Sequence, residues 1–494
     1  MTVIDAPGGD IDAPPDAAVP PLSAMMQRNY IKASNTGTND NFGSTIVLSA
    51  DGTTLVIAAP YEASASGQAD DSASAAGAVY VFTRTGTSWT QQAYLKASNP
   101  AANDRFGTAL ALSADGSMLA VSASGEDSAA VGINGNQANE AALGSGAVYV
   151  YTRAGTAWTQ QAYIKASNTE ANDEFGVSIA LSSDGSTLAV GANGEDSQGF
   201  GNQTDNTMAQ AGAAYVFVRT GTTWNQQAYL KASNPGAGDR FGGAVALSGD
   251  GATLAVGAYF ESSGSVGVNG AQNEAIVVSG AVYVLTRVGT TWSHQAFVKA
   301  SNTGSGDLFG STVALSTDGT TLAVGASGEE SAAPGINGNQ ADNTAPQAGA
   351  VYTFTRTGTT WSQQAYIKAS NPGANDLFSR SGLSLSGNGS ILVVGAFWED
   401  GADVGINGND ADNSASEAGA AYVYMRSGTT WSQSYYVKAS NAALTDRFSI
   451  GIGISGDGAT LAIGAPLEDS SAVGLEGNQA DNATQESGAV YVFR

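Results

Sequence analysis

One phrase recurs seven times along this chain of 494 residues, and its period constrains the fold more than any other feature. Each copy is headed by a phenylalanine in the phrase Asp-x-Phe, and the copies are 64 to 70 residues apart. The seven phenylalanines are Phe42, Phe106, Phe175, Phe241, Phe309, Phe378 and Phe448. A period of this kind indicates a repeat architecture in which each unit packs against its neighbours.

Every copy contains four segments that are expected to be strands. In the fifth copy they span residues 311–316, 321–326, 350–356 and 361–369, and their apolar residues alternate or form short runs rich in Val, Tyr, Phe and Thr. The first and second segments are joined by Asp-Gly in six copies and by Asn388-Gly389 in one. This dipeptide favours the type I′ turn of a β-hairpin. No stretch has a helical period.

Seven four-stranded antiparallel units, each too small to bury its own faces, predict an all-β, seven-bladed β-propeller. The first segment of each copy is expected to be innermost, because its small residues and glycines suit a crowded centre. The last copy ends at Arg494 after its third segment, whereas residues 29–33 form a fourth segment without a copy of its own. Pairing the N-terminal strand with the three C-terminal strands would close the ring and leave no free edge there.

The first 28 residues have a different composition. From Ile4 to Pro21 they are almost entirely Asp, Pro, Ala and Gly, with too little apolar surface to order the chain. We therefore expect a disordered, acidic, proline-rich tether over residues 1–28 and the propeller over residues 29–494. A remnant of recombinant expression would have a similar composition. A tether would suit a surface lipoprotein whose anchor is not part of this sequence.

Charge and composition exclude several classes of function. The chain has 44 acidic and 19 basic side chains, a net charge of -25, which repels nucleic acid and anionic lipid surfaces. There is no run of about 18 apolar residues, so no transmembrane segment is expected. The absence of cysteine excludes disulfides and thiolate sites, and the single His294 leaves little room for histidine-based catalysis or zinc.

The repeat phrases resemble those of a known family. Phe-Gly heads most copies, Gly-Ala or Ala-Pro follows the second segment, as at Ala59-Pro60 and Ala465-Pro466, and Gly-Ala-Val-Tyr-Val opens the third. These phrases, over residues 29–494, resemble the FG-GAP repeats of the integrin α-chain propeller and of bacterial surface proteins. The resemblance implies a non-enzymatic, extracellular or cell-surface role in binding or adhesion, by a monomeric propeller on a tether. Integrin-type calcium loops between the first two segments are not implied, because a single carboxylate stands there.

Most of the positive charge occupies two repeat positions. Seven arginines close the third segment, and seven lysines lie in Lys-Ala-Ser-Asn, so that 14 of 19 cations are accounted for. An architectural role is favoured, because a site for one ligand need not recur in every copy. We expect each lysine to bond the aspartate of the Asp-x-Phe phrase or a backbone carbonyl. A ligand role is the alternative. The lysines are Lys32, Lys96, Lys165, Lys231, Lys299, Lys368 and Lys438.

Two groups of aromatic residues are set apart by their positions. Six tryptophans follow the turn before the fourth segment and are expected to pack between outer strands rather than stack on sugars: Trp89, Trp158, Trp224, Trp292, Trp361 and Trp431. Phe397 and Trp398 begin the long loop of the sixth copy, and Tyr259 and Phe260 hold the same place in the fourth. Aromatic pairs on loops are candidates for partner contacts, with packing as the alternative.

The long loop between the second and third segments has 17 to 22 residues, a length that indicates a function. These loops start with carboxylates and continue with Asn-rich phrases, on the same expected face as the Asp-x-Phe aspartates. Two interpretations stay open: calcium sites built from these oxygens, or loops folded through Asn and Asp turns without metal. The candidate ligands are Glu126, Asp127, Asp307, Glu329, Glu330, Asn337, Asn339, Asp342, Glu399, Asp400, Glu468 and Asp469.

These features favour an extracellular or cell-surface propeller that presents long acidic loops to a protein partner. A lectin-like propeller that binds a glycan is the alternative, because fold alone does not choose a ligand. An enzyme acting on glycans is the third hypothesis. It is disfavoured because the carboxylates recur in every copy, and no departure marks one acid and one base. We therefore predict no enzymatic activity.

Overall fold

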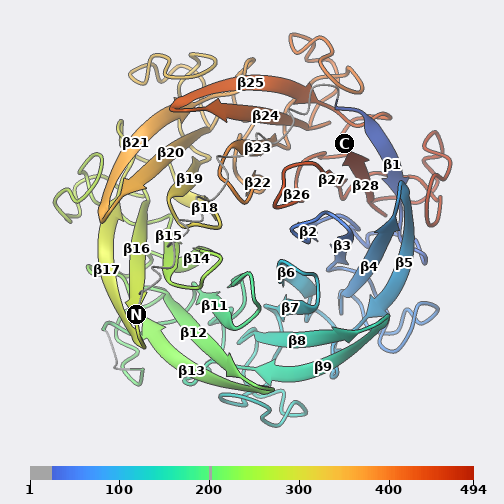
Figure 1. Ribbon diagram of the computed structural model, residues 1–494, viewed down its shortest axis with the longest axis horizontal. Coiled ribbons are helices and arrows are strands. Elements are labelled where there is room, and N and C mark those ends of the chain that lie inside the picture. Colours follow the sequence, from blue (N-terminus) through green and yellow to red (C-terminus); the bar gives the residue numbers. More distant parts are fainter. Residues whose placement is uncertain (1–24, 200–202) are drawn as a thin grey trace, which may run out of the picture.

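The hairpin turns and alternating segments of each copy form one four-stranded antiparallel sheet, and seven such sheets surround a central axis (Figure 1). The computed structural model describes residues 25–199 and 203–494. Within these ranges, no helix is long and apolar enough to cross a membrane. The predicted all-β, seven-bladed propeller is confirmed.

The first strand of each copy is innermost and the fourth is outermost (Figure 1). Blade 1 consists of β2 (Thr45–Leu48), β3 (Thr54–Ala59), β4 (Ala78–Thr85) and β5 (Ser88–Leu95). Blade 2 consists of β6 (Phe106–Leu112), β7 (Met118–Ala123), β8 (Ala147–Ala154) and β9 (Ala157–Ile164). Blade 3 consists of β10 (Ser178–Leu181), β11 (Thr187–Ala192), β12 (Ala213–Thr220) and β13 (Thr223–Leu230).

The remaining blades repeat this order. Blade 4 consists of β14 (Phe241–Leu247), β15 (Thr253–Ala258), β16 (Ala281–Val288) and β17 (Thr291–Val298). Blade 5 consists of β18 (Phe309–Leu315), β19 (Thr321–Ala326), β20 (Ala350–Thr357) and β21 (Thr360–Ile367). Blade 6 consists of β22 (Leu383–Leu385), β23 (Ile391–Ala396), β24 (Ala420–Ser427) and β25 (Thr430–Val437). Blade 7 consists of β26 (Ile452–Ile454), β27 (Leu461–Ala465), β28 (Ala489–Phe493) and β1 (Gln27–Ile31).

The blades approach each other closely at the centre, which explains the small residues there. A Cβ atom on Gly464 of β27 would lie 2.1 Å from the carbonyl oxygen of Gly43 in blade 1. Such a distance is far inside van der Waals contact, so a larger residue would push the two blades apart. The same holds in a first strand, since a Cβ atom on Gly242 of β14 would lie 2.2 Å from the carbonyl oxygen of Ala213 in blade 3. The strand order confirms the predicted inner position of the first segment (Figure 1).

Blade 7 is closed by both ends of the chain. Strand β1 pairs antiparallel with β28, with Tyr30 opposite Tyr491, and the backbone groups of Met26 and Arg494 exchange two hydrogen bonds of 3.0 Å. The predicted closure is confirmed. The strand begins at Gln27, two residues before the expected start of the propeller, and Met25 is already buried. The rest of the expected tether, residues 1–24, lies outside the described residues.

The core lies between adjacent sheets. In one cluster, Val148 and Val150 of blade 2 pack against Leu188 and Val190 of blade 3. The repeated tryptophans join these interfaces, as predicted. Five of them donate an indole N–H to a glutamine in the outer strand of the preceding blade, at 2.8 to 3.1 Å. For Trp89 of blade 1 the preceding blade is blade 7, where Arg28 stands at the position of that glutamine. The indole nitrogen of Trp89 has no hydrogen-bond partner among the described residues.

Candidate functional site

The long loops and the loops that connect successive blades emerge on one face of the propeller, here called the loop face. The alternation of antiparallel strands places them there and leaves the short hairpin turns on the opposite face. Adjacent loops are bonded to each other: the backbone N–H groups of Asn103 and Arg105, in a connecting loop, donate to Ser74 and Ala75 in the long loop of blade 1. The loop face is therefore one continuous surface.

Each long loop begins with a glutamate that forms a buried ion pair with the repeat lysine of the same blade. The nitrogen–oxygen distances are 2.7 to 3.1 Å, and six of the seven lysine side chains are fully buried. The expected contact with the Asp-x-Phe aspartates is therefore wrong, whereas the alternative contact with a backbone carbonyl is present in two blades, where Lys96 donates to Gly77 at 2.5 Å and Lys299 to Gly280 at 2.6 Å. The pairs are Lys32–Glu468, Lys96–Glu62, Lys165–Glu126, Lys231–Glu195, Lys299–Glu261, Lys368–Glu329 and Lys438–Glu399.

The carboxylate of Glu126 shows how each pair anchors its loop. One oxygen accepts hydrogen bonds from the Tyr163 hydroxyl at 2.6 Å and from the Asn99 amide at 3.0 Å. The other accepts from Lys165 Nζ at 2.7 Å and from the Ser128 backbone at 3.1 Å. Because Asn99 follows the outer strand of blade 1, the cluster joins two blades as well as the base of the loop. We call such a cluster a loop anchor.

The other end of the long loop is bound to the same anchor. Lys165 Nζ also donates to the Ser145 hydroxyl at 2.7 Å, and Ser145 lies at the end of the loop that Glu126 begins. Burial lowers the pKa of Lys165 while the charge of Glu126 opposes this shift, and burial raises the pKa of Tyr163 well above its usual value. A buried pair of this kind is costly to form but fixes geometry when every polar atom is satisfied.

The Asp-x-Phe aspartates cap their own turns instead of binding the lysines. Asp104 accepts a hydrogen bond from the backbone N–H of Ala101 at 2.8 Å and is buried. Burial raises the pKa of six of these carboxyls to about 7, and that of Asp307 to about 6. The six are Asp40, Asp104, Asp173, Asp239, Asp376 and Asp446.

These raised pKa values predict a stability that falls as the pH rises. An unfolded aspartate titrates near ~3.9, so between that pH and about 7 the folded chain binds more protons than the unfolded chain. The stabilisation is complete below the unfolded pKa and is lost as the pH passes the folded pKa. We expect a higher melting temperature at pH 5.5 than at pH 8.0 in buffers of equal ionic strength. An Asp104→Asn variant should show a smaller difference, whereas equal melting at both pH values would contradict the assignment.

The Asn-rich phrase of the long loop folds back on the outer strand. In blade 2, Ile133 forms a β-bridge with Ile164, and Asn134 accepts the Tyr163 N–H with its side chain at 3.0 Å. Equivalent bridges are Ile31–Leu475, Val268–Val298, Ile336–Ile367 and Ile406–Val437. In these five blades the long loop pairs with the last residues of the outer strand and so covers that end of its edge, which would otherwise be open to pairing with another chain.

The proposed calcium ligands are engaged in these same contacts. Glu126, Glu329, Glu399 and Glu468 are paired with lysines. Asp127, Asp400 and Asp469 accept backbone N–H groups at 2.7 to 2.9 Å, and Asp307 accepts that of Gly304 at 2.6 Å. Asn337, Asn339 and Asp342 accept hydrogen bonds from Tyr366, Ala341 and Thr344. Glu330 follows the lysine-paired Glu329 and so holds the repeat position that Asp127, Asp400 and Asp469 hold in their blades.

Over residues 25–199 and 203–494, no group of three or more His, Cys, Asp or Glu side chains lies close enough to hold a metal ion. The contacts therefore agree with the second interpretation of the sequence, in which Asn and Asp turns fold the loops. Calcium binding by these loops stays a prediction, and the geometry offers it no ligand set.

The loop aromatics differ in exposure. Phe397 is only 8% exposed, and the half-buried Trp398 lies 5.8 Å below the guanidinium of Arg447, so this pair is mainly packed. Tyr259 is half-buried, whereas the neighbouring ring of Phe260 is 36% exposed. Tyr61, at the same repeat position in blade 1, is 41% exposed. Comparing this position across all seven copies would have identified Tyr61 from the sequence.

Comparisons with known proteins identify the same repeat that the sequence shows. A family model described as "FG-GAP repeat" matches residues 25–82, 89–151, 158–217, 224–285, 292–354 and 361–424. The comparison with curated proteins finds no match. Hydrazine synthase of Kuenenia stuttgartiensis is similar over 88% of this chain and 94% of its own, with 13% identity and a TM-score of 0.48. A putative 6-phosphogluconolactonase from Bacteroides uniformis is similar over 80% and 85%, with 11% identity and a TM-score of 0.43. Neither likeness bears on function.

Proposed function

Because the chain belongs to the FG-GAP repeat family, we propose that it is a non-enzymatic binding or adhesion propeller that takes a protein partner on its loop face. The fold and family are compatible with binding, and the extracellular or cell-surface location is part of the proposal. The loop anchors support it physically. Loops that are fixed before binding lose little conformational entropy when a partner docks, so more of the contact energy appears as affinity.

One observation carries the proposal. Among the described residues, eleven large apolar side chains are exposed, and nine of them lie in long or connecting loops. The nine are Tyr61, Val131, Leu143, Phe260, Val266, Val277, Val404, Leu444 and Val473. They are distributed over the loops of blades 1, 2, 4, 6 and 7, so most of the exposed apolar side chains lie on the loop face. Exposed apolar area on one face is typical of a surface that binds another protein. The other two are Val288, which ends β16 at the opposite face, and Met26, which pairs with Arg494 just before the outer strand of blade 7 begins.

Blade 4 offers a matched pair of substitutions for a test. Val277 in the long loop is 65% exposed, and Val288 at the opposite end of the same blade is 81% exposed. We expect Val277→Asp combined with Phe260→Ala to weaken binding to a partner at least tenfold, a change of about 1.4 kcal/mol, because both remove apolar contact area. Val288→Asp should leave binding unchanged.

The measurement is the affinity of each purified variant for proteins selected by the wild type from an array of extracellular proteins. Equal melting temperatures of the variants would show that the fold is intact. Loss of binding by Val288→Asp, with the loop-face variant unaffected, would place the interface on the opposite face. Selection of no protein, with glycans bound instead, would favour the lectin-like alternative.

A further inference from the structure

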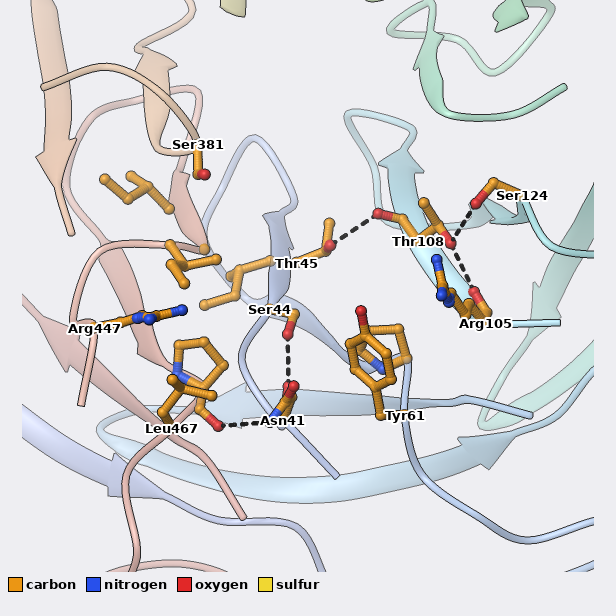
Figure 2. A pocket seen from close by; sticks show the side chains of 16 residues that line it. Asn41, Ser44, Thr45, Tyr61, Arg105, Thr108, Ser124, Ser381, Arg447 and Leu467 are labelled. Atoms are coloured by element: carbon orange, nitrogen blue, oxygen red, sulfur yellow. Dashed lines mark hydrogen bonds between the residues drawn. The ribbon is translucent and has the colours of Figure 1, made fainter. Parts of the chain in front are cut away.

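A pocket of about 550 Å³ opens where the loop face meets the central axis, and we call it the axial pocket. Its sixteen lining residues come from the inner parts of blades 6, 7, 1 and 2, and Figure 2 shows them around a common space. Arg105 and Arg447 lie on opposite sides of this space, and Tyr61 lies between them. A volume of this size is within the ordinary range for small-molecule sites, roughly 300 to 1,000 Å³.

The charge of the axial pocket is opposite to that of the chain. Two arginines and no aspartate or glutamate line it, although acidic side chains outnumber basic ones by 44 to 19. Fourteen of the 19 cations stand at the two repeat positions described above, and Arg105 and Arg447 are among the five that do not. These two arginines are therefore not required by the repeat, because other copies have Asn, Glu or Leu at the same position.

The two arginines differ in how they are held. The guanidinium of Arg105 lies 5.6 Å from the centre of the Tyr61 ring, and within the described part of the chain it has no carboxylate partner. Arg447 donates from Nε and Nη2 to Glu417, at 2.9 and 2.7 Å, which fixes its direction and leaves Nη1 for another acceptor. An anion that enters the pocket would meet two preplaced guanidinium groups.

The rest of the lining suits a sugar. Hydroxyl groups of Ser44, Thr45, Thr108, Ser124 and Ser381 line the pocket. Three of them already donate to backbone carbonyls: Ser44 to Asn41, Thr45 to Thr108 and Thr108 to Arg105, at 2.8 to 3.1 Å. The Thr108 and Ser124 hydroxyls also bond each other at 3.1 Å, and each hydroxyl oxygen has lone pairs that accept from a sugar hydroxyl. Tyr61 is 41% exposed, and the face of its ring away from Arg105 would provide an aromatic platform for the apolar face of a sugar ring.

We propose that the axial pocket binds a carboxylate-bearing saccharide of the uronic acid type. The carboxylate pairs with the guanidinium of Arg105, one sugar ring packs against Tyr61, and sugar hydroxyls bond the serine and threonine side chains and the Nη1 of Arg447. An acidic peptide would also pair with the arginines, but it would bring fewer hydroxyl groups to the serine and threonine side chains than a sugar ring does. Tyr61 belongs both to the axial pocket and to the exposed apolar residues of the loop face. The test of this inference uses Arg105 instead, which is not among those apolar residues, so the two proposals can be tested separately.

Isothermal titration calorimetry with digalacturonic acid tests this proposal. We expect the intact chain to bind it, lactose to bind at least about tenfold more weakly, and Arg105→Gln to weaken digalacturonate binding at least about tenfold. Arg240→Gln is the matched control: Arg240 holds the same repeat position in blade 4, outside the axial pocket, and should leave the affinity unchanged. Because Arg105 is exposed, its substitution should leave the melting temperature unchanged.

Three results would overturn the proposal. The first is no binding of digalacturonate by the intact chain at millimolar concentration. The second is equal affinity in wild type and Arg105→Gln. The third is binding of an acetylated Asp-Gly-Asp peptide without binding of the sugar, which would make the pocket a site for acidic peptides. Loss of protein-partner binding alone would leave these readouts unaffected, so the two proposals fail separately.

Discussion

Removing residues 1–33 should lower the melting temperature far more than removing residues 1–24, because only the longer deletion takes away the strand that closes the ring. Tyr30 and Ile31 of β1 are fully buried, Tyr30 in the core between blades 6 and 7 and Ile31 in the core between blades 7 and 1, and burial of such side chains stabilises by about 1.5 to 3 kcal/mol each. The longer deletion also removes Lys32 and the Tyr30 hydroxyl, which bond the carboxylate of Glu468 at 2.7 and 2.8 Å.

An additional cost comes from the exposed edge. Without β1, the β28 strand presents unpaired backbone groups, which favour aggregation. Calorimetry of the two truncated chains measures the difference. A peptide of residues 25–33 added to the longer truncation should restore much of the lost melting temperature, because it can pair with β28 as the natural strand does. Equal melting of the two truncations would show that closure does not depend on this strand.

Replacing Glu126 by Gln should destabilise the protein strongly, although it changes only a few atoms. The substitution leaves the fully buried Lys165 without its countercharge, and breaking one side of a buried ion pair costs about 3 to 5 kcal/mol. We expect a large fall in the melting temperature by calorimetry. Glu140→Gln, an exposed position in the same long loop, removes the same charge and should have almost no effect.

A second variant separates the pair from the local polar network. Combining Glu126→Gln with Lys165→Met removes both charges, so the unpaired cation is gone while the introduced amide oxygen still accepts from Tyr163 or Asn99, as the carboxylate does. We expect this double variant to recover much of the stability lost by Glu126→Gln alone. A double variant as unstable as the single one would mean that the hydrogen bonds, not the charges, hold the loop.

The fold was predictable because it depends on a pattern that recurs seven times. Asp-Gly turns fixed the hairpins, and the orphan strand near Tyr30 fixed the closure, so one consistent arrangement remained. The tryptophan interfaces followed from their register on outer strands. The bridges that Ile133 and its counterparts form with the outer strands could not be predicted, because an isolated bridge between a loop and a strand produces no periodic pattern in the sequence.

The loop anchors were only partly predictable. The regular spacing marked the lysines as architectural, but two carboxylates per copy, such as Asp104 and Glu126, are expected on the same face, and spacing alone does not say which one Lys165 meets. An alignment of the seven copies would have identified the partner of the lysine. Every copy has a glutamate three residues after the last alanine of its second strand, whereas the residue after that glutamate varies. The axial pocket could not be predicted, because its residues come from four blades and only the closed ring brings them together.

Native-state hydrogen exchange is the measurement that tests the loop anchors, on which the proposed rigid binding face depends. In the folded protein, the backbone N–H of Gly146 donates to the Glu126 carbonyl at 2.9 Å and that of Asn134 to the Tyr163 carbonyl at 2.8 Å. We predict that peptides covering residues 124–146 exchange orders of magnitude more slowly than unstructured chain, and that Glu126→Gln accelerates exchange in blade 2 while blade 5 stays protected. Exchange of the wild-type long loops at the rate of an unstructured peptide would contradict the account.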